Sequence, residues 1–425
     1  RMKKKCIGIM LTVILLFSCI FAAVPSYAAV TDLPELTGQS AILINADTGE
    51  VLYDKYKDFQ TYPASTTKVM TALLALEHLD LDQVCTISHD ASYTEGSRIF
   101  LLEGEQVTVE QLLYAMLLAS ANDAAIALAE ACAGDVDSFA EMMNEKAEEL
   151  GAENTHFANP NGLPDETHMT TVADMALFAR EAMKNETFRK IVSTYEYTIP
   201  ATELQPEARL IHNSNRLLYD EVHKAVIGDE TRPYKYDGIL GIKTGYTDAA
   251  RSCLVAAAER DGMTLIGVVY RSEPETLYPD MIQLLDFGFD NFKMVDLGMK
   301  AGDVVGEAAV KEGKRGKIDV TVKSDVKATV ELMEGQKFSD DPSDYDFKIE
   351  SDQLTAPVKK GEKAGRMVVY RGDSAVAQLD VYAAEDMEKT AVGGLLPKAV
   401  IIAALIAVLA GALFILRKIW RRKTC

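Results

Sequence analysis

The chain has 425 residues, of which 48% are hydrophobic and 25% are charged, and its formal net charge is -20. A chain of this length and apolar content can form two domains with buried cores. Its basic residues form no large patch between the two ends, which argues against nucleic-acid binding.

The N-terminal segment is typical of a secretory signal peptide. Residues 2–28 run from three lysines through an apolar stretch to a small-x-small ending at Ser26 and Ala28. This pattern predicts cleavage after Ala28 and export of the remainder of the chain. A lipoprotein signal cut before Cys19 is the alternative, and the bulky Phe17 disfavours it. We therefore expect a signal peptide over residues 1–28.

The first predicted elements of the exported chain lead into an unusual helix. Residues 40–55 read as two strands around an Asp-Thr-Gly turn. A helix is expected over 65–79, and in it Lys68 stands three residues after Ser65 within an apolar run. Because these positions share one helix face, the amine can reach the hydroxyl. A serine becomes a strong nucleophile when a neighbouring base takes its proton, although such a pair is more often a helix cap and a surface lysine.

Several further helices are predicted in the middle of the chain. The first begins with a capping-box pattern made by Thr108 and Gln111. The helices are expected over 108–119, 122–133, 137–151 and 172–184. Ser120 and Asn122 fall at the turn between the first two, where small polar side chains usually cap helices.

Strand periodicity returns after the helices. Strands are expected over 239–244, 252–259 and 263–270. Strands at both ends of a helical region predict an α/β (α+β) domain in which helices surround an antiparallel sheet built from chain-distant segments. Lys243 and Thr244 lie at the end of the first of these strands, and the glycines beside them, including Gly245, let the backbone approach a ligand.

The character of the sequence changes after residue 293. Short apolar stretches between Gly-, Asp- and Lys-rich turns predict a small all-β domain over 294–390, best interpreted as a spacer or docking domain. Residues 399–416 carry no charge and would span about 27 Å as a helix, so we predict a transmembrane anchor over 395–416. By the positive-inside rule the basic tail, 417–425, is cytoplasmic. The expected location is the cell membrane, with the preceding domains outside the cytoplasm.

Three short motifs gain meaning from their combination. S-x-x-K at Ser65, Ser-x-Asn at Ser120 and K-T-G at Lys243 occur in the order found in penicillin-binding proteins and β-lactamases. The combination has a physical logic, because a second ammonium about 4 Å from Lys68 would disfavour its protonated form by about 4 kcal/mol at an effective dielectric near 20. Such a lysine would hold its proton weakly enough to act as a base.

With these motifs in place, the chain resembles the serine-type D-alanyl-D-alanine carboxypeptidases, a family of low-molecular-mass penicillin-binding proteins. The resemblance extends over about residues 31–390. It is supported by the stretches 156-HFANPNGLP-164, 212-HNSNRLL-218 and 354-LTAPVKKGEKAGRMVVY-370. It implies a β-lactamase/transpeptidase-like catalytic domain over 31–293.

The resemblance also implies roles for the residues of the first two motifs. Ser65 would be the acylated nucleophile and Lys68 its general base. Ser120 would relay a proton to the leaving D-alanine, and Asn122 would hold the peptide amide.

The third motif and a later arginine would bind the substrate. Lys243 would tune the base and, with Thr244, bind the terminal carboxylate. The backbone N–H groups of Ser65 and Tyr246 would form the oxyanion hole beside Gly245. Arg271 would assist in binding the carboxylate.

The implied reaction removes the terminal D-alanine from peptidoglycan stem peptides ending in D-Ala-D-Ala, without a metal or organic cofactor, and β-lactams would inhibit it. Two alternatives remain open. A β-lactamase needs a glutamate that activates water, and the one E-x-x-x-N match between Ser120 and Lys243, at Glu181 and Asn185, ends an amphipathic helix. A non-catalytic wall-binding protein on the same fold would be expected to lose a motif residue.

The exported part contains three cysteines, Cys85, Cys132 and Cys253. An odd number cannot all pair, and none has metal-binding spacing, so we interpret them mainly as buried apolar residues. One disulfide among them is left open.

Overall fold

The structure, a computed structural model, describes residues 33–332, 340–372 and 374–390. This part of the chain divides into two compact units, residues 33–294 with 331–332, and the remainder from residue 295 onward. The predicted signal peptide, transmembrane helix and basic tail lie outside the described residues. Within the described ranges, no helix has the length and apolar character needed to cross a membrane.

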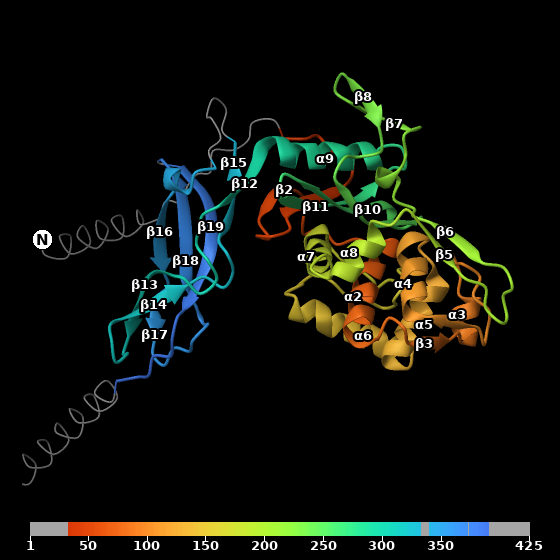
Figure 1. Cartoon of the computed structure of the whole chain (residues 1–425), viewed down its shortest axis with the longest axis horizontal. Coiled ribbons are helices and arrows are strands. Elements are labelled where there is room, and N and C mark those ends of the chain that lie inside the picture. The colour runs from red at the N-terminus through yellow and green to blue at the C-terminus, as the bar shows by residue number, and fades with distance from the viewer. Residues whose placement is uncertain (1–32, 333–339, 373, 391–425) are drawn as a thin grey trace, which may run out of the picture. The chain divides into compact units, whose positions relative to one another are not determined.

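The first unit is built on a five-stranded sheet with the order β2-β1-β11-β10-β9, whose pairs are antiparallel (Figure 1). The strands are β1 (Ser40–Asn45), β2 (Val51–Lys55), β9 (Ile239–Thr247), β10 (Arg251–Arg260) and β11 (Met263–Ser272). Ser40 pairs with Tyr270, so the first strand of the chain lies beside one of the last strands of the unit. The prediction of an α+β fold with a sheet made from distant segments is confirmed.

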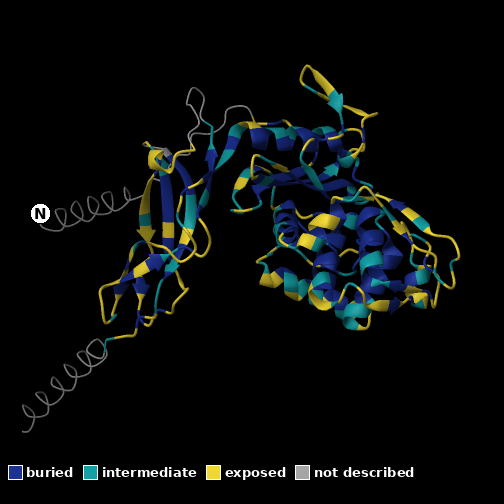
Figure 2. Ribbon diagram, in the orientation of Figure 1, coloured by how far each residue is buried: buried dark blue, intermediate teal, exposed yellow. Residues whose placement is uncertain are grey.

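Alternate residues of β1 serve different cores because successive side chains of a strand point to opposite faces. Ile42 and Ile44 belong to a core shared with most of the helices. Ala41 and Leu43 belong to a second core shared with α9 (Leu277–Asn291). The sheet therefore lies between α9 and the remaining helices, and Figure 2 shows its strands as mostly buried.

Helix α2 (Lys68–His78) lies inside the larger core. Every residue from Lys68 to Ala75 is buried, as expected of a helix that is apolar on all sides. The other helical elements of this unit are α3 (His89–Tyr93), α4 (Val109–Leu118), α5 (Asn122–Ala133), α6 (Val136–Glu149), α7 (Val172–Ala182), α8 (Glu186–Val192) and the 3-10 turns η1 (Ala64–Thr67) and η2 (Arg216–Leu218). The capping box predicted for α4 is present, with both reciprocal bonds between Thr108 and Gln111.

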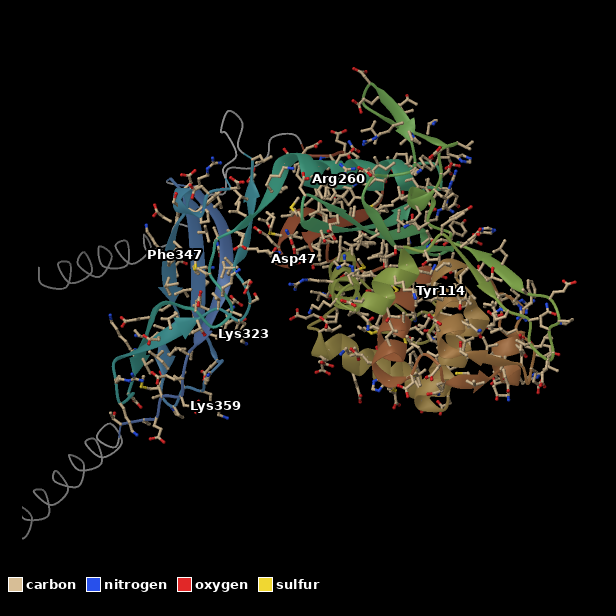
Figure 3. The ribbon with its side chains drawn as sticks, viewed as in Figure 1. Asp47, Tyr114, Arg260, Lys323, Phe347 and Lys359 are labelled. Carbon is tan, nitrogen blue, oxygen red and sulfur yellow. The ribbon has the colours of Figure 1, made fainter. Side chains whose placement is uncertain are left out.

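Three two-stranded hairpin-like pairs complete the first unit. They are β3 (Val84–Thr86) with β4 (Gln106–Thr108), β5 (Glu196–Ile199) with β6 (Arg209–His212), and β7 (Lys224–Ile227) with β8 (Glu230–Pro233). Tyr114 of α4, labelled in Figure 3, stacks on Tyr197 of β5 with ring centroids 3.8 Å apart. This contact helps to fix β5 and β6 on the helical part of the unit.

The second unit is all-β, as its sequence predicts. Its main sheet has the order β16-β18-β19-β14-β13-β17, and β12 pairs with β15. The strands are β12 (Phe292–Asp296), β13 (Val304–Lys311), β14 (Lys317–Thr321), β15 (Lys327–Glu331), β16 (Asp346–Ser351), β17 (Leu354–Thr355), β18 (Lys363–Arg371) and β19 (Ser374–Ala383), with a 3-10 turn, η3 (Pro342–Asp344). Ile318 and Val320 show the alternation that forms its core.

Candidate active site

Ser65 lies in the 3-10 turn η1, directly before α2, and not in an α-helical turn. The two following threonines anchor this turn. Thr66 Oγ1 lies 2.6 Å from Tyr270 Oη, and Thr67 Oγ1 lies 2.8 Å from His168 Nε2. The backbone of η1 is therefore tied to β11 and to the segment before α7, while Ser65 itself lines a cavity.

The amine of Lys68 is placed among three oxygen atoms. Its Nζ lies 2.9 Å from Ser65 Oγ, 2.7 Å from Asn122 Oδ1 and 2.6 Å from the Asn161 carbonyl oxygen. A neutral amine has two N–H groups and one lone pair. If the N–H groups donate to Asn122 and Asn161, the lone pair is directed at the Ser65 hydroxyl, which is the geometry that a general base requires.

Both motif lysines are buried, and burial changes their protonation. Lys68 has no exposed surface and Lys243 is 1% exposed. Burial lowers the pKa of Lys68 well below its ordinary value; the Lys243 charge lowers it further, and the Asp123 carboxylate opposes both. Burial lowers the pKa of Lys243 to about 7. Desolvation thus contributes more to the lowered pKa of Lys68 than does the repulsion between the two lysines, which the motifs predict.

Asn122 and Asp123 connect the start of α5 to the loop between α3 and β4. Asn122 donates from Nδ2 to the Glu95 carbonyl oxygen at 2.6 Å. The buried Asp123 carboxylate accepts the backbone N–H groups of Ile99 and Leu101, each at 3.1 Å. Asn122 is therefore held by protein groups at both ends of its amide, and its oxygen orients Lys68.

The K-T-G segment lies within the edge strand β9, which continues to Thr247, and so the prediction that it ends a strand is wrong. Lys243 donates from Nζ to the Thr244 carbonyl oxygen at 2.9 Å. Gly245 passes so close to η1 that a Cβ atom there would lie 3.1 Å from the Ser65 nitrogen. An edge strand beside the nucleophile leaves backbone groups that an extended peptide can pair with.

A tight loop supports the other side of Lys68. Besides the Asn161 carbonyl, the Pro160 carbonyl accepts a hydrogen bond from Thr71 of α2 at 2.6 Å. Gly162 has a φ of 83°, and a Cβ atom on it would lie 1.9 Å from the Ala64 carbonyl oxygen. Only glycine fits this approach, so this residue sets how the loop meets η1.

These elements surround a cavity of about 600 Å³. It is lined by Ser65, Ser97, Ala119, Ser120, Ser214, Arg216, Thr244, Gly245, Tyr246, Ser252, Pro274, Leu277 and Tyr278. The structure thus brings together the predicted Ser65, Ser120 and β9 residues. Arg271 does not line the cavity, and its Nη1 donates to the Ala249 carbonyl oxygen at 2.8 Å.

Several further residues that line this cavity have no role predicted from the sequence, among them the polar Ser97, Ser214 and Arg216. The last two lie in the stretch 212–218, which resembles the family without being one of the three motifs. Ser214 Oγ lies 2.7 Å from Thr244 Oγ1. That contact gives the stretch a defined place beside β9.

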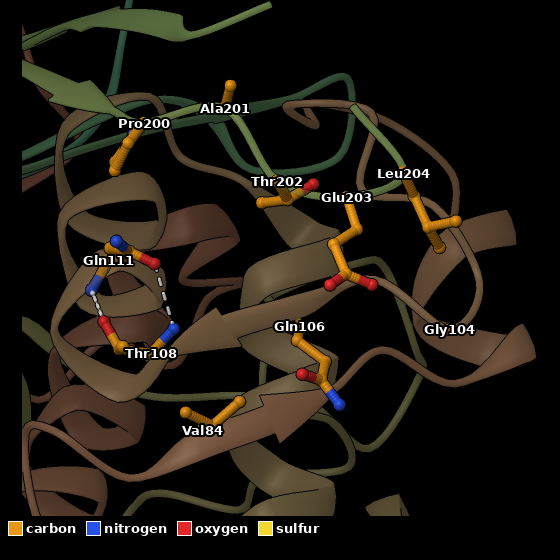
Figure 4. A pocket seen from close by; sticks show the side chains of 10 residues that line it. All are labelled: Val84, Gly104, Gln106, Thr108, Gln111, Pro200, Ala201, Thr202, Glu203 and Leu204. Carbon is orange, nitrogen blue, oxygen red and sulfur yellow. Dashed lines mark hydrogen bonds between the residues drawn. The ribbon is translucent and has the colours of Figure 1, made fainter. Parts of the chain in front are cut away.

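A second cavity, of about 520 Å³, lies between the β3–β4 pair and the segment that follows β5 (Figure 4). Among its lining residues, Thr108 and Gln111 bond to each other in the capping box. The described residues of its lining include no lysine and no serine. Of these two cavities, the first therefore contains the candidate nucleophile and lies next to its base.

Cys85, Cys132 and Cys253 are all free thiols in the structure. Burial raises the pKa of Cys132 and of Cys253 to about 12, so neither is a reactive thiolate. Across the described ranges, no three His, Cys, Asp or Glu side chains are grouped as a metal ion would require.

Comparison with known proteins agrees with this geometry. Residues 27–273 match the family model of the D-alanyl-D-alanine carboxypeptidases, and residues 292–389 match that of the penicillin-binding protein 5 C-terminal domain. The D-alanyl-D-alanine carboxypeptidase DacF of Bacillus subtilis is 36% identical over 358 residues, which cover 83% of this chain and 86% of the relative.

Solved structures extend the likeness to the fold. Penicillin-binding protein 5 from Haemophilus influenzae superimposes with a TM-score of 0.68 at 27% identity, over 85% of this chain and 100% of that one. The Streptomyces K15 DD-transpeptidase superimposes with a TM-score of 0.55 at 34% identity, over 61% of this chain and 100% of its own.

The chain has the features of a low-molecular-mass penicillin-binding protein. These are a catalytic unit of sheet and helices, the three motifs in order, and an all-β C-terminal unit. Within that class, the chain belongs to the D-alanyl-D-alanine carboxypeptidase family. Its enzymatic class is therefore that of the serine-type D-alanyl-D-alanine carboxypeptidases.

Proposed function

We propose that this enzyme removes the terminal D-alanine from peptidoglycan stem peptides through an ester formed at Ser65. The observation that carries the proposal is the 2.9 Å contact between Lys68 Nζ and Ser65 Oγ. It occurs where burial and Lys243 both lower the pKa of the lysine. A lysine in this setting takes the serine proton far more readily than an exposed lysine.

In the first step Lys68 takes the hydroxyl proton, and Ser65 Oγ attacks the carbonyl carbon of the penultimate D-alanine. The negative charge that develops on the carbonyl oxygen is stabilised by the backbone N–H groups of Ser65 and Tyr246. The close approach of Gly245 to the Ser65 nitrogen supports this pairing of donors from two elements.

In the second step the C–N bond breaks and D-alanine leaves as an amine. Ser120 faces the same cavity and relays the proton from Lys68 to this amine. The ester at Ser65 is then attacked by water, which gives the shortened peptide and restores the serine. A β-lactam opens its ring on Ser65 by the same attack.

The cavity lining favours a peptidase over a β-lactamase. Among the described residues that line it, none is Asp or Glu. Glu181, the one sequence candidate for a deacylating base, belongs to α7 and forms an ion pair with Lys184 at 2.6 Å. A penicillin ester at Ser65 therefore lacks a carboxylate to activate water. Its leaving amine also stays attached to the acyl group, whereas D-alanine departs from the peptide ester, so we expect the penicillin ester to persist longer.

Labelling with a fluorescent penicillin tests the nucleophile. The wild-type protein is expected to carry a stable covalent label, and Ser65→Ala is expected to carry none while keeping the wild-type melting temperature. A label on Ser65→Ala would exclude Ser65, and rapid loss of the label would favour the β-lactamase.

Incubation of residues 29–390 with a pentapeptide ending in D-Ala-D-Ala tests the reaction. Release of free D-alanine is expected. Cross-linked peptide alone would indicate a transpeptidase, and no product would favour a non-catalytic wall-binding protein.

We further propose the domain arrangement expected from the sequence: a cleaved signal peptide over 1–28, a catalytic domain over 31–293, a β domain over 294–390 and an anchor over 395–416. The uncharged run and the basic residues after it support a single span with the catalytic domain outside the cytoplasm. Penicillin labelling of fractionated cells tests this. The label should sediment with membranes for the full chain and appear in the soluble exported fraction when residues 391–425 are deleted.

A further inference from the structure

The active-site cavity contains a cation that the three motifs do not include. Arg216, the first residue of η2, is the only Lys or Arg among the described residues that line it. Motif residues Lys68 and Lys243 are buried behind the lining. A ligand entering the cavity therefore meets the positive charge of Arg216 directly.

The guanidinium is held in place but retains free donors. Its Nε donates to the Asp220 carboxylate at 2.6 Å. Its carbon lies 4.8 Å from the ring centre of Tyr234 and 5.5 Å from that of Tyr278. Its Nη2 atom is buried and has no hydrogen-bond partner within the described chain. An arginine fixed by one carboxylate and two rings is pre-organised to bind a planar anion with its remaining N–H groups.

Asp220 does not cancel this capacity. Its carboxylate also accepts the backbone N–H groups of Val222 and His223, and the His223 ring nitrogen lies 2.9 Å away. The negative charge is thus shared among several donors. It orients the Arg216 fork through Nε, and 28% of the Arg216 side-chain surface stays exposed and can face a ligand.

Neutral hydroxyl donors also line the cavity. Ser214 and Thr244 place their hydroxyl oxygens 2.7 Å apart, and both residues line the cavity. The Tyr278 hydroxyl donates to the Ser214 carbonyl oxygen at 3.3 Å, which connects this pair to α9. Two hydroxyls and a guanidinium form a set of donors suited to a carboxylate.

We propose that Arg216 binds the free carboxylate of the residue that leaves, and so selects peptides that end immediately after the scissile bond. This inference rests on the proposed function, because it assigns the negative end of the same substrate. It also explains how the cavity recognises a carboxylate although the predicted Arg271 bonds to Ala249 outside the lining.

The test compares two acylating agents that differ in one charge, a penicillin with its free carboxylate and the methyl ester of the same penicillin. Arg216→Gln is expected to lower the acylation rate by the free acid about 10- to 100-fold, the effect of one charge-assisted hydrogen bond or more. The rate with the methyl ester should stay within a few-fold of wild type. Arg216→Lys should restore part of the preference for the acid.

The matched control is Arg260→Gln. Arg260 also lies over two aromatic rings, those of Tyr236 and Phe289, but it does not line the cavity. This variant should retain both rates.

If Arg216→Gln lowered the acylation rates by the free acid and by the methyl ester equally, a structural role would be indicated and the inference overturned. If neither rate fell, the inference would also be overturned. Failure of the proposed function is recognised separately, because the wild-type protein would then release no D-alanine from the pentapeptide and carry no label at Ser65.

Discussion

Lys68 has two charged neighbours that act on its proton in opposite directions. The Lys243 charge lowers the pKa of Lys68, and the Asp123 carboxylate raises it. Burial of all three side chains keeps water from screening these interactions. The availability of the base at a given pH therefore depends on residues that do not contact Ser65.

Removing either neighbour is expected to move the pH dependence of acylation. Acylation requires neutral Lys68, so its rate rises with pH as this lysine loses its proton. In Lys243→Gln the pKa of Lys68 rises, so the acidic limb of the pH–rate profile for acylation moves to higher pH. In Asp123→Asn the pKa of Lys68 falls, so this limb moves to lower pH. Rates of penicillin labelling across pH measure both, and shifts of the same sign would contradict this account.

The burial of Lys243 also predicts a pH-dependent stability. Its pKa is about 7 in the folded protein and 10.5 in a model peptide, so between these values the unfolded chain binds more protons. The free energy of unfolding contributed by this group therefore rises with pH from about 7 to about 10.5.

Lys243→Met should be more stable than wild type near pH 7, and the difference should shrink as the pH approaches 10.5. Denaturant unfolding of both proteins across this range measures the difference. An advantage that did not change with pH would refute the assignment to this amine.

At the scale of elements, the contact between the loop around Gly162 and η1 sets the distance from the Asn161 carbonyl to Lys68. A methyl group on Gly162 would collide with the Ala64 carbonyl oxygen. The loop would have to move, and the acceptor that orients Lys68 would move with it.

Gly162→Ala is expected to destabilise the protein by about 4 kcal/mol or more, because the cost of overlap with the Ala64 carbonyl adds to backbone strain of about 1–3 kcal/mol. It should also slow penicillin labelling of the folded fraction. Gly151→Ala is the matched control, because Gly151 also has a φ of 83° but open space around its Cβ position. In the control, the free energy of unfolding should fall by only about 1–2 kcal/mol, the cost of placing alanine in a left-handed backbone conformation. The control should react with penicillin at the wild-type rate. Equal losses in the two variants would show that packing against η1 is unimportant.

The elements also show what could be predicted from the sequence. The strands of the sheet, the capping box of α4 and the three motif positions follow from local patterns of side chains. The Asn161 carbonyl could not be predicted as a partner of Lys68, because a backbone acceptor leaves no side-chain signature. Helix α9 was not predicted, and Pro279 and Gly288 within it weaken its helical pattern. The sequence indicates Arg216 only as part of a stretch that resembles the family, since its place in the cavity depends on how η2 and α9 lie in the fold.

At the scale of the whole molecule, every residue of the candidate active site lies in the first unit. The Streptomyces K15 structure aligns over its entire length with only 61% of this chain. The whole of that solved structure therefore corresponds to only part of this chain.

A fragment of residues 33–296, which keeps α9 and the end of its core, is expected to react with penicillin at the rate of the full exported chain. Stopped-flow labelling of the two proteins measures this. A folded but unreactive fragment would show that the second unit contributes to the chemistry.

The pairing of β1 with β11 has a consequence for how the enzyme is made. Strand β1 is synthesised first, but its partner is among the last strands of the unit, and the Thr66–Tyr270 bond beside the nucleophile joins residues 204 positions apart. Closing so long a loop is slow. The turn that carries Ser65 is thus completed only when nearly the whole unit has folded, so a partly folded chain contains the serine without its support. Reaction with penicillin should therefore report the completion of folding as well as the chemistry of the site.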